Sequence, residues 1–261
     1  MPFSQFEDVK YYQFESLLDA GVRQMVFTRH GGVSPEPWDS LNVGLTVGDD
    51  PANVARNREL CFAAAGRPTE SLSDSWLVHG SDVYVYDTPR PQDGNPPPKA
   101  DILLTDNPEV SLYMRYADCV PVLLVDPVHR AIGLAHAGWQ GTVKQVAKAA
   151  VSAMGERYGS VPGDLLAAVG PSIGPARYEV GPEVAEQVEA AFGEDAEDLL
   201  PRFGSSVHLD LWEANRLSLK RAGVSRIEVA GLCTFDNHQD WFSHRAEKGQ
   251  TGRFGALLAL D

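Results

Sequence analysis

The segment that most constrains the fold is a pair of short apolar runs near the middle of the chain. Pro121–Val125 and Ala131–Ala135 flank Asp126–Arg130, a short connection that contains a proline. Two β-prone runs separated by so few residues predict an antiparallel hairpin. We place the centre of the turn near Pro127–Val128, and this choice sets the register of the pairing.

The predicted register brings one thiol and one imidazole together at the open end of the hairpin. Cys119 lies opposite His136 or Ala137, and cross-strand neighbours have Cβ atoms about 5 Å apart. Such a pair suits either a Cys–His nucleophile or two ligands of a zinc ion. A catalytic zinc commonly has three protein ligands, and the best third candidate is His79, which ends an apolar run and precedes a glycine.

Alternating strands and helices predict an α+β fold, a layered α/β sandwich with mixed, largely antiparallel sheets. Thr142 and Gln145 have the spacing of a capping box at the start of one helix. The predicted helices are Asp50 to Gly66, Thr142 to Met154, Pro182 to Phe192 and Asp210 to Ala222. The strands predicted outside the hairpin are Val22–Thr28, Asp82–Tyr86, Ser111–Arg115, Leu165–Val169 and Arg226–Ala230.

We expect residues 1–261 to form a single domain. The Pro-rich stretch 89–99 cannot lie inside a sheet, because prolines lack an N–H donor, and it is predicted to be an exposed loop. No run of about 18 apolar residues is present to span a membrane. Met1–Lys10 is polar and acidic, unlike a signal peptide, and the three cysteines are too scattered for a disulfide framework. These features predict a cytoplasmic protein without a membrane partner.

The charge balance argues against a nucleic-acid partner. The chain has 22 Lys and Arg against 36 Asp and Glu, a formal net charge of −14, and no block of basic residues. Binding to phosphate backbones requires clustered Lys and Arg.

A series of short motifs occurs in order along nearly the whole chain. The motifs are Thr28 to Ser34, Ser40 to Gly44, Val54 to Arg58, Val78-His79-Gly80, Ala117 to Pro121, His136 to Trp139, Gly170 to Gly174 and Thr251-Gly252-Arg253. With these motifs the chain resembles the YfiH-like family, also called the laccase-domain or multicopper polyphenol oxidase family and, more recently, purine nucleoside phosphorylase. In that family the metal ligands are the His of V-H-G, the Cys of A-D-C and the His of H-A-G-W. The resemblance thus implies that His79, Cys119 and His136 hold the metal.

The resemblance also implies a zinc-dependent enzyme that acts on purine nucleosides. The expected reactions are phosphorolysis of adenosine, inosine, guanosine or methylthioadenosine to the base and ribose 1-phosphate, and deamination of adenosine. Zinc lowers the pKa of bound water toward about 7 and so supplies hydroxide for the deamination. The expected partners are nucleosides and phosphate.

Other residues near the motifs are candidates for catalysis and substrate binding. Asp118, beside a ligand, is the candidate proton shuttle in addition to the three metal ligands. The candidates for phosphate binding are Arg29, His30 and Asn42. Arg29 and His30 precede two glycines, and an arginine can bind phosphate through two parallel hydrogen bonds. Trp139 could stack on a purine base.

Three alternatives remain open at this point. One is a metal-free cysteine hydrolase or amidase that uses Cys119 as nucleophile and His136 as base. Another is a copper-dependent polyphenol oxidase with Cu²⁺ in place of zinc. The sequence argues against it, because multicopper sites use several His-x-His pairs, whereas this chain has seven histidines and no such pair. The third is a zinc-binding interaction module without enzymatic activity.

Overall fold

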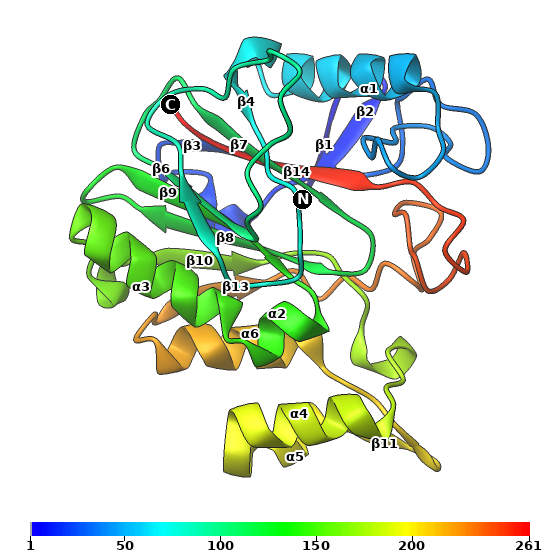
Figure 1. Cartoon of the computed structure of the whole chain (residues 1–261), viewed down its shortest axis with the longest axis vertical. Coiled ribbons are helices and arrows are strands. Elements are labelled where there is room, and N and C mark those ends of the chain that lie inside the picture. Colours follow the sequence, from blue (N-terminus) through cyan, green and yellow to red (C-terminus); the bar gives the residue numbers. More distant parts are fainter. Residues whose placement is uncertain (1) are drawn as a thin grey trace.

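The computed structural model describes residues 2–261, which form two stacked six-stranded sheets with helices outside them (Figure 1). One sheet has the order β1-β2-β3-β14-β7-β4 and the other β13-β10-β8-β9-β6-β5; most pairs are antiparallel, and β4–β7, β5–β6 and β10–β13 are parallel. The predicted α+β sandwich with mixed, largely antiparallel sheets is confirmed.

The strands are β1 Phe3–Phe6, β2 Val9–Tyr12, β3 Val22–Phe27, β4 Leu72–Ser73, β5 Val83–Val85, β6 Ile102–Thr105, β7 Ser111–Tyr116, β8 Val120–Asp126, β9 Ala131–Ala137, β10 Leu166–Val169, β11 Arg202–Phe203, β12 Ser206–Val207, β13 Arg226–Val229 and β14 Phe254–Leu260. The helices are α1 Pro51–Ala64, α2 Trp139–Val143, α3 Val146–Tyr158, α4 Pro182–Phe192, α5 Ala196–Leu199 and α6 Leu211–Arg221. Every strand predicted from the sequence is present, with ends that differ by two residues or fewer. β14, which lies between β3 and β7, was not predicted.

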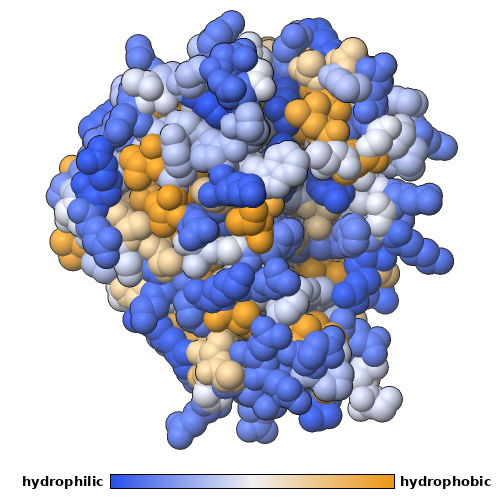
Figure 2. Space-filling view, in the orientation of Figure 1, coloured by the Kyte–Doolittle hydropathy of each residue, from blue (hydrophilic) through white to orange (hydrophobic). Residues whose placement is uncertain are grey.

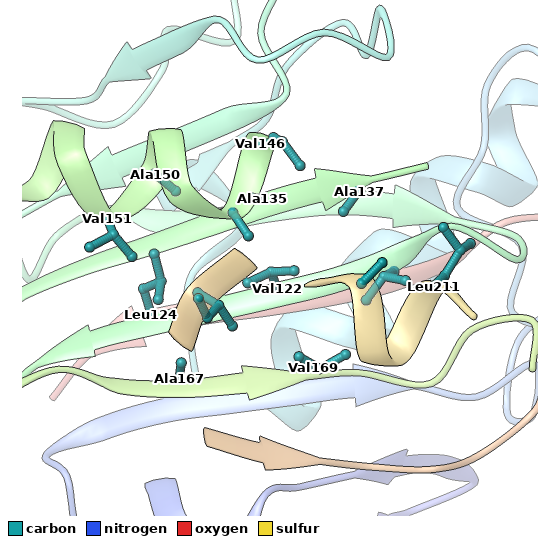
Figure 3. Close-up of a cluster of buried hydrophobic side chains, with 14 of the residues drawn as sticks. Val122, Leu124, Ala135, Ala137, Val146, Ala150, Val151, Ala167, Val169 and Leu211 are labelled. Atoms are coloured by element: carbon teal, nitrogen blue, oxygen red, sulfur yellow. The ribbon is translucent and has the colours of Figure 1, made fainter. Parts of the chain in front are cut away.

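The alternation of side chains along β8 explains why this strand is apolar throughout. Val122 and Leu124 face α3 and α6, whereas Leu123 and Val125 face the other sheet, so both faces of the strand are buried (Figure 3). α1 covers the opposite face of the β14 sheet (Figure 1). The molecule therefore has four layers, helix, sheet, sheet and helix.

The hairpin forms as predicted, but its register differs. Pro121 pairs with His136 and Asp126 with Ala131, so the turn lies one residue later than expected. The reason is the carboxylate of Asp126, which accepts the N–H groups of Val128 and His129 and closes the turn over the next residues. Cys119 accordingly lies just before the first paired residue of β8 rather than opposite His136.

The predicted capping box is wrong. Thr142 lies inside α2, where its hydroxyl accepts a hydrogen bond from Asn215, and Gln145 adopts a left-handed conformation with φ 61° between α2 and α3. By contrast, Asp50 caps α1 through the N–H of Ala52, as the Asp-Pro sequence predicts.

The surface seen in Figure 2 is mostly hydrophilic, with small scattered groups of hydrophobic residues. No helix within residues 2–261 combines the length and the hydropathy that crossing a membrane requires.

Candidate metal centre

Three potential ligands from three separate segments meet at one end of the β8–β9 hairpin. His79 comes from the turn before β5, Cys119 from the residue before β8, and His136 from β9 itself. Their ligand atoms all lie within 4.8 Å of one another, and the two imidazole rings have centroids 4.9 Å apart. Among the residues that the structure describes, this is the one group of His, Cys, Asp or Glu side chains identified as able to hold a metal ion.

The buried carboxylate of Asp101 holds two of these ligands in place. Its Oδ1 accepts the N–H of His79 at 3.1 Å and the Nδ1–H of His136 at 2.9 Å. Its Oδ2 accepts the N–H groups of Val78 and Gly80, so one side chain organises the whole V-H-G turn. Asp101 directly precedes β6, whose Ile102 pairs with Ala135 of β9. Because Nδ1 of His136 is engaged, Nε2 is the ring nitrogen left for a metal.

His79 itself has a left-handed backbone, with φ 56°. A non-glycine residue rarely adopts this conformation unless its surroundings impose it. Here the three N–H groups bound by Asp101 impose it. The backbone conformation of His79 therefore helps to set the position of its imidazole.

The ionisation of the group favours the thiolate form of Cys119, whereas His136 must lose the proton on Nε2 before this nitrogen can bind a metal. Burial raises the pKa of the Cys119 thiol, but the positive charge of His136 and hydrogen bonds from His136 and His79 outweigh burial and lower this pKa overall. Burial lowers the pKa of His136, and the thiolate of Cys119 and the carboxylate of Asp101 raise it above its usual value. Burial raises the pKa of Asp101, but hydrogen bonds from His136 and Gly80 lower it overall. A negative thiolate is the form that binds a metal.

The space around the group also fits a metal. A Cβ on Gly138 would lie 2.9 Å from Sγ of Cys119 and 3.1 Å from Cδ2 of His79, so only glycine leaves room for these two ligands. Two imidazoles and a thiolate match the donors that zinc prefers, and three protein ligands beside a cavity leave a position open. The group could therefore hold a metal.

Two neighbouring cavities, which share part of their lining, lie beside the His79–Cys119–His136 group. The larger, about 560 Å³, is bounded partly by Arg115, Arg245 and Arg253. The smaller, about 290 Å³, is bounded partly by Ile173 and Leu211. His79, Asp118, Cys119, Trp139 and Tyr178 line both cavities. Small-molecule sites usually have volumes of about 300–1,000 Å³, so the combined space suits a small substrate.

Asp118 lies at the cavity, as the sequence predicts, but its carboxylate is already engaged. Oδ1 accepts the hydroxyl of Thr234 at 2.7 Å, and Oδ2 accepts the N–H of Arg245 at 2.7 Å. Its φ is 80°, so this residue also forms the sharp bend that leads into Cys119. In the structure Asp118 therefore positions the cavity wall, and its role as a proton shuttle stays a prediction.

The residues predicted to bind phosphate lie away from the cavity lining. The Arg29 guanidinium is buried and donates to the carbonyl groups of Asp39 and His238 and to the carboxylates of Asp39 and Glu247. His30 pairs with Asp240. These contacts hold the loop that follows β3. They also occupy the Arg29 guanidinium, which therefore does not reach His79, Cys119 or His136.

Asn42 is buried and acts on the cavity indirectly. Its Oδ1 accepts the N–H groups of Gly44 and Arg253, and its Nδ2 donates to Asp49. It therefore fixes two segments that line the larger cavity.

Sequence reasoning missed Asp101 and the arginines of the cavity. An aspartate directly before an apolar strand was the available indication for Asp101. Arg253 belongs to one of the motifs that carried the family resemblance, whereas neither Arg115 nor Arg245 is marked by any local pattern.

Comparison with known proteins identifies the family of this chain. Residues 23–261 match the family described as multi-copper polyphenol oxidoreductase laccase. The chain is 42% identical to the purine nucleoside phosphorylase of Deinococcus radiodurans, over 89% of this chain and 87% of the relative. It is 36% identical to the purine nucleoside phosphorylase YlmD of Bacillus subtilis, over 89% of this chain and 86% of the relative. The crystal structure of YlmD from Geobacillus stearothermophilus superposes with a TM-score of 0.92 at 34% identity and covers 99% of this chain and 98% of that one. The chain therefore belongs to the multi-copper polyphenol oxidoreductase laccase family, together with YlmD.

Proposed function

We propose that this protein is a zinc-dependent purine nucleoside phosphorylase. The observation that carries the proposal is the His79–Cys119–His136 group beside a cavity, in a chain whose relatives are named purine nucleoside phosphorylases. In the proposal these three residues hold the metal. Zinc held by these residues would supply a Lewis acid and would lower the pKa of a water molecule bound to it.

The chain's own residues have distinct tasks in this proposal. Asp101 keeps His136 in the tautomer whose Nε2 is free and anchors the turn that carries His79. Trp139 and Tyr178 offer aromatic surfaces for a purine ring in the smaller cavity, where Ile173 and Leu211 add apolar contacts. The candidate nucleosides are adenosine, inosine, guanosine and methylthioadenosine.

The proposed reaction is a balanced group transfer. An oxygen of phosphate forms a bond with C1′ of the ribose while the bond from C1′ to the purine nitrogen breaks. The electron pair of that bond goes to the purine, which takes up one proton. The products are ribose 1-phosphate and the free base. Deamination of adenosine, in which water replaces the amino group and ammonia leaves, is the second proposed activity of the same site.

The test is to incubate zinc-loaded protein with each nucleoside, with and without phosphate, and to identify products by mass spectrometry. Ribose 1-phosphate that requires phosphate supports the phosphorylase, and inosine from adenosine supports the deaminase. His79→Ala, Cys119→Ala and His136→Ala are expected to lose both bound zinc and turnover. The control is His129→Ala, because His129 pairs with Asp126 in the hairpin turn and does not line the cavities. Full turnover in the three ligand variants would refute the proposal.

One observation favours a second candidate, a cysteine hydrolase. Cys119 has a lowered pKa, and His136 is oriented by Asp101, an arrangement similar to a nucleophile, a base and an orienting carboxylate. A hydrolase predicts that metal-free protein stays active and that covalent modification of Cys119 abolishes activity. The phosphorylase predicts that a chelator removes activity and that added zinc restores it.

A multicopper oxidase is less well supported. Such an enzyme requires several copper ions, and residues 2–261 present a single His and Cys group of suitable geometry. Metal analysis combined with a polyphenol oxidation assay tests this alternative directly.

A further inference from the structure

The larger cavity has an arginine-rich wall in a protein of net charge −14. Arg115, Arg245 and Arg253 line it, and Asp118 is the one carboxylate among its lining residues. Asp118 keeps its negative charge while its oxygens accept hydrogen bonds, and the Cys119 thiolate is also negative, so the three arginines outnumber the anionic groups of this lining. Three guanidinium groups around one cavity create a potential that attracts anions.

Arg253 is held in position by its backbone and by the start of its side chain. Its N–H donates to Asn42, and a Cβ on Gly44 would lie 2.7 Å from Cγ of Arg253, so the stem packs closely on that glycine. Nη1 donates to the carbonyl groups of Thr251 and Gly252 at 3.2 and 2.8 Å. No hydrogen bond from Nε or Nη2 to any of residues 2–261 is found. The guanidinium is thus half-buried, oriented and still able to donate.

Arg245 has a similar arrangement on the neighbouring segment. Its N–H donates to Asp118, its Nη1 donates to the carbonyl of Glu179, and its guanidinium lies over the ring of Tyr178 at 5.0 Å. Within the described chain, no ion pair joins Arg245 or Arg253 to a carboxylate. Because Tyr178 also lines the smaller cavity, Arg245 lies where the two cavities meet.

Arg115, the third arginine of the lining, is partly neutralised. Its Nη2 donates to the carbonyl of Ser75 at 2.6 Å, and its Nη1 lies 3.8 Å from the buried carboxylate of Asp74. Arg58 and Arg90 approach the same carboxylate, at 3.8 and 3.0 Å. Three arginines therefore share one acid, and this adds positive charge behind the cavity wall.

We propose that Arg253 and Arg245, backed by Arg115, form the subsite for a tetrahedral oxyanion, which is the inorganic phosphate of the phosphorolysis. Guanidinium groups bind phosphate oxygens through paired, charge-assisted hydrogen bonds, and here they adjoin the metal ligands in one cavity. Phosphate in this subsite would lie beside a nucleoside held in the smaller cavity. The identity of the oxyanion rests on the proposed function, whereas the anion site itself rests on the arginines.

The first experiment measures binding without catalysis. Zinc-loaded wild-type protein is titrated with inorganic phosphate in a calorimeter, and Arg253→Gln and Arg245→Gln are titrated under the same conditions. Loss of a charge-assisted hydrogen-bond pair predicts affinity lower by about 10- to 100-fold in each variant. The matched control is Arg216→Gln, because Arg216 pairs with Glu213 on α6, outside both cavities. Unchanged phosphate affinity in folded, zinc-loaded Arg253→Gln and Arg245→Gln would overturn the subsite.

The second experiment separates phosphate from nucleoside. In steady-state phosphorolysis, Arg253→Gln is expected to raise the KM for phosphate by about 10- to 100-fold and to change the KM for the nucleoside by less than about 3-fold. Arg253→Lys is expected to recover part of the loss, because it restores the charge without the paired donors. Equal increases in both KM values would contradict a phosphate subsite and indicate a general disturbance of the cavity.

The outcomes distinguish this proposal from the proposed function. If the wild type forms no ribose 1-phosphate but binds phosphate in an Arg253-dependent way, the anion subsite stands and the phosphorylase is refuted. If ribose 1-phosphate forms with a phosphate KM that neither arginine affects, the phosphorylase stands and the subsite is refuted. Arg245 is exposed, so its variant remains informative if Arg253→Gln does not fold.

Discussion

Replacing Asp101 by Asn gives the sharpest test of how this chain builds its candidate metal centre. Asp101 accepts four hydrogen bonds, two on each oxygen, from the N–H groups of Val78, His79 and Gly80 and from Nδ1 of His136. Asparagine keeps the shape of the side chain but has only one oxygen. Its NH₂ group must therefore face two N–H donors that have lost their acceptor.

The expected cost follows from those two donors. A buried donor without a partner costs about 1–3 kcal/mol, so Asp101→Asn should lower the free energy of unfolding by about 2–4 kcal/mol, since the V-H-G turn is only partly buried. Loss of the carboxylate that orients a ligand histidine also typically weakens metal binding by about 10- to 100-fold. Both effects come from one side chain.

The assay measures the two effects separately. Urea unfolding of metal-free protein gives the change in stability, and competition with a chelator gives the zinc affinity. The control is Asp82→Asn, because Asp82 lies in the next turn of the same segment and is exposed. A change in unfolding free energy below about 0.5 kcal/mol, together with zinc affinity within about twofold of the wild type, would refute the role assigned to Asp101.

Three further predictions concern the metal centre, the pH dependence of stability and the core. Gly138→Ala should weaken zinc binding with little loss of stability, because its Cβ would lie 2.9 Å from Sγ of Cys119. Competition with a chelator measures the zinc affinity. The control is Gly163→Ala, where a Cβ would meet no atom within 4 Å, and this variant should bind zinc as the wild type does. Burial raises the pKa of Asp49, but hydrogen bonds lower it overall from its usual 3.8, so its contribution to stability is present above about pH 4 and is lost as the pH falls through the lower folded-state pKa. Urea unfolding at pH 7 and pH 3 should therefore show less loss of stability in Asp49→Asn than in the wild type, and an equal loss would contradict this. Leu124→Ala should lower the free energy of unfolding by about 2–5 kcal/mol, because this fully buried side chain packs between β8 and the helices; a thermal or urea titration that shows under about 1 kcal/mol would contradict the packing (Figure 3).

Local patterns in the sequence were sufficient for many of the elements, though not for β6 or β14, and for part of the site. Asp50 followed by Pro51 predicts the start of α1, and the glycine at 193 marks the end of α4, because capping and chain reversal depend on neighbouring residues. The two apolar runs around Asp126 predict the hairpin, and the hairpin alone brings Cys119 near His136. The family motifs then point to His79 as the third ligand, which the structure places with the other two.

Only the tertiary structure decided the contacts between segments that are far apart in the chain. Asp101 reaches His79 and His136 because β6 pairs with β9, and no local period encodes that pairing. The same holds for the arginines. Arg29, beside two glycines, donates to carbonyl and carboxylate groups, whereas Arg253 lines the larger cavity. A side chain's availability for a ligand depends on which partners the fold packs against it, and that is a property of the assembled structure rather than of the sequence around it.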